Sequence, residues 1–214
     1  MARLPERRPL LCYITDRESV AGENLVPLIE QAVAAGVDLI QIRERDLAAA
    51  ALLRLAKSAL ERARGSATRV LVNDRLDVAL AAGADGIHLP AHSLSVAEVR
   101  RRHPRLLIGA SCHTLEELRR ADGDGADFVV FGPVFATASK KDYGPPLGLA
   151  QLSAAVSAAK IPVLALGGIT RANAAQCLAV GAAGLAAISL FQTSPDLSEL
   201  VRQLRALVPA SQSG

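Results

Sequence analysis

A pentapeptide that recurs four times, each time near the end of an alanine-rich stretch, constrains the fold more than any other feature of the chain. The copies read AAGVD at 34–38, AAGAD at 81–85, GDGAD at 123–127 and AVGAA at 179–183, and a short apolar run follows each of them. Glycine just past a helix takes up the left-handed conformation that ends the helix without a Cβ clash. The repeat therefore predicts four joints between a helix and the strand that follows it.

The spacing of the copies predicts twice that number of units. The copies start 47, 42 and 56 residues apart, which leaves room for one more strand and helix between them. The predicted strands are nearly continuous apolar runs, as is typical of parallel strands covered by helices. They span 10–15, 39–43, 70–73, 86–89, 107–111, 128–132, 162–166 and 184–189, and the predicted helices include 25–35, 48–63, 114–121 and 197–208, with caps at Asn24 and Ser95.

Eight strand–helix units in about 200 residues predict an α/β fold, a single-domain TIM (β/α)8 barrel near the lower size limit of that fold. A doubly wound open sheet is the alternative, but it would carry Gly-x-Gly-x-x-Gly after the first strand. The chain has YITDR at 13–17 instead. We therefore expect an N-terminal extension over 1–9, a catalytic barrel over 10–209 and a disordered tail over 210–214.

Composition argues against several classes of partner. The basic runs at 3–8 and 100–105 are not interleaved with aromatic residues, so we expect no nucleic-acid partner. No apolar segment reaches the length that spans a bilayer, so we expect no membrane partner. Cys12, Cys112 and Cys177 are odd in number and widely spaced, which indicates reduced thiols and a cytoplasmic protein.

In a TIM barrel the active site lies at the carboxyl ends of the strands, and a phosphate commonly binds after strands 7 and 8. Gly167, Gly168 and Ser189 occupy those positions here. Glycine lets backbone N–H groups approach an anion closely, so this segment predicts a phosphate site. A tight turn without a ligand is the plainer interpretation of the two glycines.

The loop over 135–148 is too long for a plain connection between a strand and a helix. Its hydroxyls and lysines, which include Thr137, Ser139 and Lys140, are typical of a flap that closes over an anion. A solvated surface loop is the alternative.

Arg43 and Arg45 flank Glu44 at the end of the second predicted strand. The period of two in a strand sends both arginines to one side and Glu44 to the other. Two guanidinium groups on one side suit a polyphosphate, because each can grip oxygens in a bidentate fork. A surface ion pair between Arg43 and Glu44 is the alternative.

Two further strand ends carry candidate chemistry. Asn73 and Asp74 follow the third strand, where Asp74 could bind Mg²⁺ or cap the next helix. His113 follows the fifth strand and could act as a general acid–base or cap a helix. A nucleophilic dyad of Cys112 and His113 is disfavoured, because neighbours on a strand point to opposite sides.

Taken together, these segments resemble the thiamine-phosphate synthase and thiazole tautomerase family. The resemblance runs in family order over nearly the whole chain. It rests on YITD at 13–16, QIRER at 41–45, VNDR at 72–75, GADGIHL at 83–89, SCHT at 111–114, the run 131–148 and LGGI at 166–169.

In the synthase, the resemblance implies, a pyrimidine diphosphate loses pyrophosphate, and the nitrogen of a thiazole phosphate captures the resulting cation. The partners would thus be two phosphorylated small molecules, with Mg²⁺ as cofactor. The implied metal ligand is Asp74, and the implied catalytic residues are Ser111, His113 and Lys140. The implied pyrimidine diphosphate site is Gln41, Arg43, Arg45, Asn73 and Lys140, and the implied thiazole phosphate site is Thr137, Ser139, Gly167, Gly168, Ile188 and Ser189.

Two departures from the synthase pattern keep other activities open. The pattern His-x-Gly-Gln-x-Asp after strand 4 supplies a second metal ligand, but here Ser93 stands at that Asp, and Arg45 stands where a lysine is usual. These changes resemble the tautomerases, which move a proton with a histidine matching His113 and need no metal. The retained Asp74 favours the synthase. A non-catalytic sensor of a thiamine-pathway phosphate is a third hypothesis, and a homo-oligomer is compatible with all three.

Overall fold

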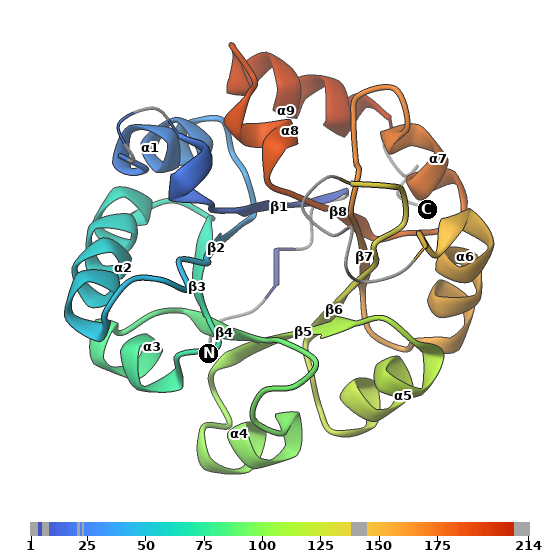
Figure 1. The fold of residues 1–214 in the computed structure, drawn as a ribbon, viewed down its shortest axis with the longest axis horizontal. Coiled ribbons are helices and arrows are strands. Elements are labelled where there is room, and N and C mark those ends of the chain that lie inside the picture. The colour runs from blue at the N-terminus through green and yellow to red at the C-terminus, as the bar shows by residue number, and fades with distance from the viewer. Residues whose placement is uncertain (1–3, 6–8, 21, 23, 138–144, 208–214) are drawn as a thin grey trace.

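A closed barrel of eight parallel strands, paired in chain order from β1 to β8 and back to β1, forms the centre of the molecule (Figure 1). The computed structural model describes residues 4–5, 9–20, 22, 24–137 and 145–207. The predicted TIM barrel is therefore confirmed. The strands are β1 Leu10–Ile14, β2 Leu39–Ile42, β3 Arg69–Asn73, β4 Gly86–Leu89, β5 Leu107–Cys112, β6 Phe128–Phe131, β7 Val163–Leu166 and β8 Gly184–Ala187.

Helices surround the barrel on all sides (Figure 1). Over the described residues, no helix is long and apolar enough to cross a membrane. The helices are α1 Val26–Ala34, α2 Ala49–Ala63, α3 Leu76–Ala82, α4 Val96–Arg102, α5 Leu115–Gly123, α6 Gly148–Ala158, α7 Ala174–Ala179, α8 Ser189–Gln192 and α9 Leu197–Ala206, and a 3-10 turn, η1, spans Arg17–Ser19.

The structure moves several predicted boundaries. The last strand ends before Ser189, because Ile188 leaves the extended conformation (φ −97°, ψ −76°) and starts the short helix α8. Helix α1 has Leu25 at its N-cap, although the Asn24 side chain still accepts a hydrogen bond from the Val26 amide at 3.2 Å. The predicted cap at Ser95 is confirmed. The expected extension and tail lie largely outside the described residues.

The glycine of each repeated pentapeptide has the left-handed backbone that the sequence predicts. Gly36, Gly83, Gly125 and Gly181 have φ values of 82°, 70°, 90° and 95°. A side chain at these positions would be strained, because L-residues disfavour positive φ. The conformation of the four joints thus follows from local backbone chemistry.

The aspartate that ends three of the copies ties each joint to the preceding strand of the barrel. Asp38 accepts a hydrogen bond from the Leu11 amide at 2.7 Å, and Asp85 accepts one from the Val70 amide at 2.9 Å. Asp127 does the same for β5. Because these residues precede their strands, the ties lie at the amino ends of the strands, opposite the expected active site.

Removing the buried Asp38 carboxylate is expected to destabilise the fold by about 3 kcal/mol, because it also removes the ion pair of the half-buried Arg205 and leaves that guanidinium only its hydrogen bonds to the carbonyls of Pro9 and Gly36. The side chain of Asp38 is 4% exposed and lies 2.7 Å from Arg205 Nη2. Asp85→Ala removes the equivalent hydrogen bond, from the Val70 amide, at a more exposed site. It should lower the free energy of unfolding by only about 1 kcal/mol. Urea unfolding of both variants checks the ranking, and equal losses would contradict it.

The inner core of the barrel changes character along its axis. Aliphatic and aromatic side chains such as Leu10, Leu39 and Phe128 fill the part towards the amino ends of the strands. Towards the carboxyl ends, β2 to β5 instead turn polar side chains inward. These are Gln41, Asn73, His88 and Ser111, of which the first three are at most 7% exposed.

Candidate functional site

A cavity of about 460 Å³ opens at the carboxyl ends of the strands and is lined by residues from all eight strand ends. Its size suits a small-molecule substrate. Most of the residues predicted from sequence line it together. These are Gln41, Arg43, Arg45, Asn73, Ser111, Thr137, Gly167, Gly168, Ile188 and Ser189.

The remaining predicted residues have other positions. Asp74 and His113 are not among the lining residues of this cavity over the described part of the chain. Ser139 and Lys140 lie outside the described residues. The expected flap is therefore described only at its two ends, which include Thr137.

Arg43 and Arg45 face the cavity, and Glu44 points away from it, as the period of two predicts. Glu44 is 5% exposed and accepts hydrogen bonds from the Thr15 hydroxyl and, at 3.0 Å, from the Arg17 amide. Burial raises the pKa of the Glu44 carboxyl, although both hydrogen bonds oppose the shift. The arrangement anchors the segment between the two arginines and leaves their charges directed at the cavity.

His88 is a site residue that the predicted set of functional residues missed. Its Nε2 lies 2.8 Å from Ser111 Oγ, and its ring is 3% exposed on the cavity floor. Gly109 makes room for the ring, because a Cβ there would lie 2.7 Å from His88 Nδ1. The sequence signal that could have identified His88 is its place in β4: its neighbours Ile87 and Leu89 are apolar and face outward, so the histidine faces the inside of the barrel. His88 can orient the Ser111 hydroxyl towards a bound substrate.

Asp74 has φ +66°, the sole positive φ at a non-glycine position in the described residues. A hydrogen bond from the Arg75 amide to the Asn73 carbonyl, at 2.7 Å, closes a tight γ-turn around it. Such turns are rare and strained. The helix-cap interpretation does not explain the strain, because α3 has Arg75 at its N-cap and no side-chain cap bond.

The Asp74 carboxylate instead accepts a hydrogen bond from Ser93 on the loop after β4. This contact brings together the two positions at which the resemblance expects metal ligands. Mg²⁺ binds through one or two carboxylates and completes its shell with water and substrate phosphate. No cluster of three acidic, histidine or cysteine ligands occurs among the described residues. One carboxylate beside a hydroxyl fits Mg²⁺ when a phosphorylated substrate shares the ion.

Gly167 and Gly168 form the tight turn that the plainer interpretation expects, with φ values of 96° and 61°. A Cβ at Gly167 would lie 2.5 Å from Pro133 Cβ, and one at Gly168 would lie 2.5 Å from the Ala136 carbonyl oxygen. Close packing under the β6–α6 loop is thus sufficient to require both glycines. They also line the cavity beside Ser189, so a role in phosphate binding stays a prediction.

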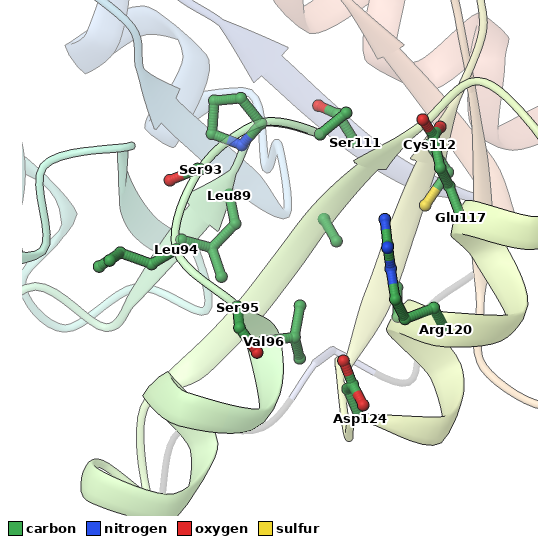
Figure 2. A pocket seen from close by; sticks show the side chains of 14 residues that line it. Leu89, Ser93, Leu94, Ser95, Val96, Ser111, Cys112, Glu117, Arg120 and Asp124 are labelled. Carbon is green, nitrogen blue, oxygen red and sulfur yellow. The ribbon is translucent and has the colours of Figure 1, made fainter.

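His113 and Cys112 do not form a nucleophilic pair. The His113 Nδ1 atom lies 2.5 Å from the Gly132 carbonyl oxygen, and the helix cap is made by Thr114 and Glu117. The Cys112 sulfur points into a second pocket, of about 390 Å³, between α4 and α5 (Figure 2). Burial raises the pKa of the Cys112 thiol to about 12. A thiol in that state is not a nucleophile at neutral pH.

All three thiols are therefore expected to resist alkylation in the folded protein. Burial raises the pKa of Cys12 to about 12 and that of Cys177 to about 11, and both side chains are at most 2% exposed. Mass spectrometry after iodoacetamide treatment at pH 8 should find no adduct in native protein and three in urea. A rapid single adduct at Cys112 would show that its thiolate forms.

Comparison with known proteins agrees with this geometry. The family profile described as thiamine monophosphate synthase matches residues 11–191. The chain belongs to the thiamine monophosphate synthase family. Two relatives named thiamine-phosphate synthase come from Methanoculleus marisnigri and Roseiflexus castenholzii. The first is 42% identical over 204 residues, covering 95% of this chain and 97% of the relative, and the second is 39% identical over 201 residues, covering 94% and 88%.

A solved family structure has the same architecture. The thiamine phosphate pyrophosphorylase from Pyrococcus furiosus superposes with a TM-score of 0.83 at 33% identity, covering 94% of this chain and 96% of that one. A 3-hexulose-6-phosphate synthase superposes with a TM-score of 0.69 at 20% identity, which shows only that the barrel fold is shared. The family match therefore rests on the sequence relatives and on the first structure.

Proposed function

We propose that this protein is a thiamine-phosphate synthase. It joins 4-amino-2-methyl-5-(diphosphooxymethyl)pyrimidine to thiazole phosphate and releases pyrophosphate. The observation that carries the proposal is that two groups of anion-binding residues line one cavity from different sides. Arg43 and Arg45 come from the end of β2, whereas Gly168 and Ser189 come from β7 and β8.

The pyrimidine diphosphate occupies the side formed by β2 and β3. Arg43 and Arg45 neutralise the diphosphate, and their planar forks can each grip two of its oxygens. On the floor of the cavity, Gln41 Nε2 donates a hydrogen bond to Asn73 Oδ1 at 3.4 Å. The two side-chain amides offer further donors and acceptors to the pyrimidine. Lys140, in the loop that follows β6, adds a further positive charge to the leaving group.

The thiazole phosphate occupies the side of the cavity formed by β7 and β8. The amides of the Gly167–Gly168 turn and the Ser189 hydroxyl bind its phosphate, and Ile188 packs against the ring. Thr137, from the loop after β6, lines the cavity and is available to this phosphate. The two reacting rings then lie between the two proposed phosphate-binding sites.

Arg43, Arg45 and Ser111 act on the reacting atoms. The bond between the pyrimidine methylene carbon and the diphosphate oxygen breaks, and its electron pair leaves with pyrophosphate. The lone pair of the thiazole nitrogen then forms the new carbon–nitrogen bond, so no proton is gained or lost. Arg43 and Arg45 stabilise the charge on the departing pyrophosphate, and Ser111, oriented by His88, lies beside the reacting centre.

Asp74 would hold Mg²⁺, with the Ser93 hydroxyl beside it, and the ion would supply further positive charge to the diphosphate when bound. Ser93→Asp adds the second carboxylate that the resemblance expects. It should lower the Mg²⁺ concentration for half-maximal activity about tenfold. A titration of activity with Mg²⁺ measures this shift, and an unchanged midpoint would argue against metal binding between Asp74 and Ser93.

A metal-independent thiazole tautomerase is the second candidate, and Ser93 is the observation that favours it. The two activities separate in one pair of assays. The synthase needs both phosphorylated substrates and loses activity in EDTA. The tautomerase isomerises thiazole carboxylate phosphate in EDTA and fails in His113→Ala. Tight binding of thiamine phosphate without turnover in either assay would identify a sensor.

A further inference from the structure

In the proposed arrangement the two rings meet between the two phosphate-binding sides, so side chains from the strands at the borders of these sides would lie nearest to them. Strand β1 lies between β8 and β2, and β5 lies between β4 and β6. Ser111 marks the border at β5. At the border on β1 two acids line the cavity, the half-buried Asp16 and the exposed Glu18, although the cavity must hold two anionic substrates. A carboxylate there opposes substrate binding unless it serves the reaction.

The backbone directs the Asp16 side chain towards the mouth of the barrel. Cys12 and Ile14 belong to the inner core, and Thr15 faces outward to Glu44. The Thr15 amide bonds to the Gln41 carbonyl at 2.9 Å, which extends the ladder past the end of β1. Asp16 is still extended, with φ −153° and ψ 94°. The alternation along the strand therefore points it inward, like Ile14.

One side chain from the other end of the chain clamps the peptide groups of Asp16. Gln192 Oε1 accepts from the Asp16 amide at 2.9 Å, and Gln192 Nε2 donates to the Asp16 carbonyl at 2.9 Å. The same Nε2 donates to Ser19 Oγ at 2.7 Å. Glu44 holds the neighbouring Arg17 amide. The loop is thus fixed on both sides, from α8 and from the end of β2.

The fixed position is not explained by a structural role of the carboxylate itself. Asp16 stands at the N-cap of η1, but its side chain makes no cap hydrogen bond. Within the described residues its carboxylate has no hydrogen bond and no ion pair, although its two peptide groups are held. A carboxylate that lines the cavity on a held backbone, and that has no partner among the described residues, is available to a ligand.

We propose that the Asp16 carboxylate stabilises the positive charge that develops on the joined rings. This inference rests on the proposed function. The methylene carbon becomes cationic as pyrophosphate leaves, and the charge then resides on the thiazolium ring of the product. A preorganised carboxylate at the border between the two sides stabilises both states, and it offers nothing to the neutral thiazole. Gln192 is the residue that positions it.

Asp16→Asn keeps the shape of the side chain and removes its charge. We expect kcat to fall about 10- to 100-fold, less than the 10²–10³ typical of a fully buried group. The KM for the pyrimidine diphosphate should stay unchanged or decrease, because a repulsive charge has gone. Structural damage would raise KM instead. Asp46→Asn makes the same change in a carboxylate that binds Arg17 outside the cavity, and it should leave kcat unchanged.

A binding experiment separates this inference from the proposed function. Calorimetry with thiamine phosphate, whose thiazolium ring is cationic, should show about tenfold weaker binding to Asp16→Asn than to the unmodified protein. Thiazole phosphate, whose ring is uncharged, should bind Asp16→Asn at least as tightly as it binds the unmodified protein. Asp16→Glu should recover part of the difference, and Gln192→Leu should lose kcat with Asp16 intact. Equal kcat and equal thiamine phosphate affinity in Asp16→Asn would overturn the role of Asp16, whatever activity the unmodified protein has.

Discussion

Asp74→Gly is expected to stabilise the fold while it lowers turnover about 10²- to 10³-fold. The glycine relieves the left-handed strain at φ +66°, which should raise the free energy of unfolding by about 0.5 kcal/mol after the entropic cost of glycine is subtracted. The same change removes the one carboxylate that we propose as metal ligand. Urea unfolding and the rate of pyrophosphate release measure the two effects on the same protein.

Asp74→Asn separates the two contributions. Asparagine tolerates positive φ about as well as aspartate, so stability should stay nearly constant while activity falls as in the glycine variant. Asp77→Asn is a matched control. It removes a carboxylate only three residues after Asp74, but this carboxylate is exposed and pairs with Arg75. If Asp74→Asn turned over at the rate of the unmodified protein, the carboxylate would have no part in catalysis.

Arg43→Met is expected to lower kcat/KM for the pyrimidine diphosphate about 10²- to 10³-fold, because it removes a charge that stabilises the leaving pyrophosphate. The KM for thiazole phosphate should remain nearly unchanged, since Arg43 follows β2 whereas the proposed thiazole phosphate site is formed by the ends of β7 and β8. Steady-state kinetics with each substrate varied in turn measures both values.

Arg43→Lys tests the geometry of the fork. It keeps the charge but cannot bind two oxygens in a plane, so about a tenfold loss is expected. Arg62→Met serves as the control, because Arg62 is 44% exposed and pairs with Glu30 on the outer helices. Equal losses for both phosphorylated substrates in Arg43→Met would contradict the division of the cavity into two sides.

The barrel could be predicted from sequence because its joints are encoded locally. A glycine with positive φ has few substitutes, so Gly36, Gly83, Gly125 and Gly181 remain visible as a repeat even though the helices between them vary. The short helix α8 was missed, since one turn after a strand has no periodicity to detect. Its existence matters for the site, because it carries Gln192.

The site could be predicted only where polar residues interrupt a strand end. Arg43, Arg45 and Ser189 follow apolar runs and were visible in this way. His88 was not selected, because a single histidine between apolar neighbours is as typical of a satisfied core residue as of a catalytic one. The positive φ of Asp74 is rare for aspartate, and the clamp on Asp16 comes from Gln192, which is distant in sequence, so only the folded backbone reveals these two features.

The central claim is that one cavity binds both phosphorylated substrates and joins them. The most direct test is to incubate the purified protein with pyrimidine diphosphate, thiazole phosphate and Mg²⁺, and to measure thiamine phosphate and pyrophosphate together. The account predicts that the two products form in equal amounts and that neither forms when one substrate or Mg²⁺ is left out. Pyrophosphate release without thiamine phosphate, or no release at all from folded protein, would contradict it.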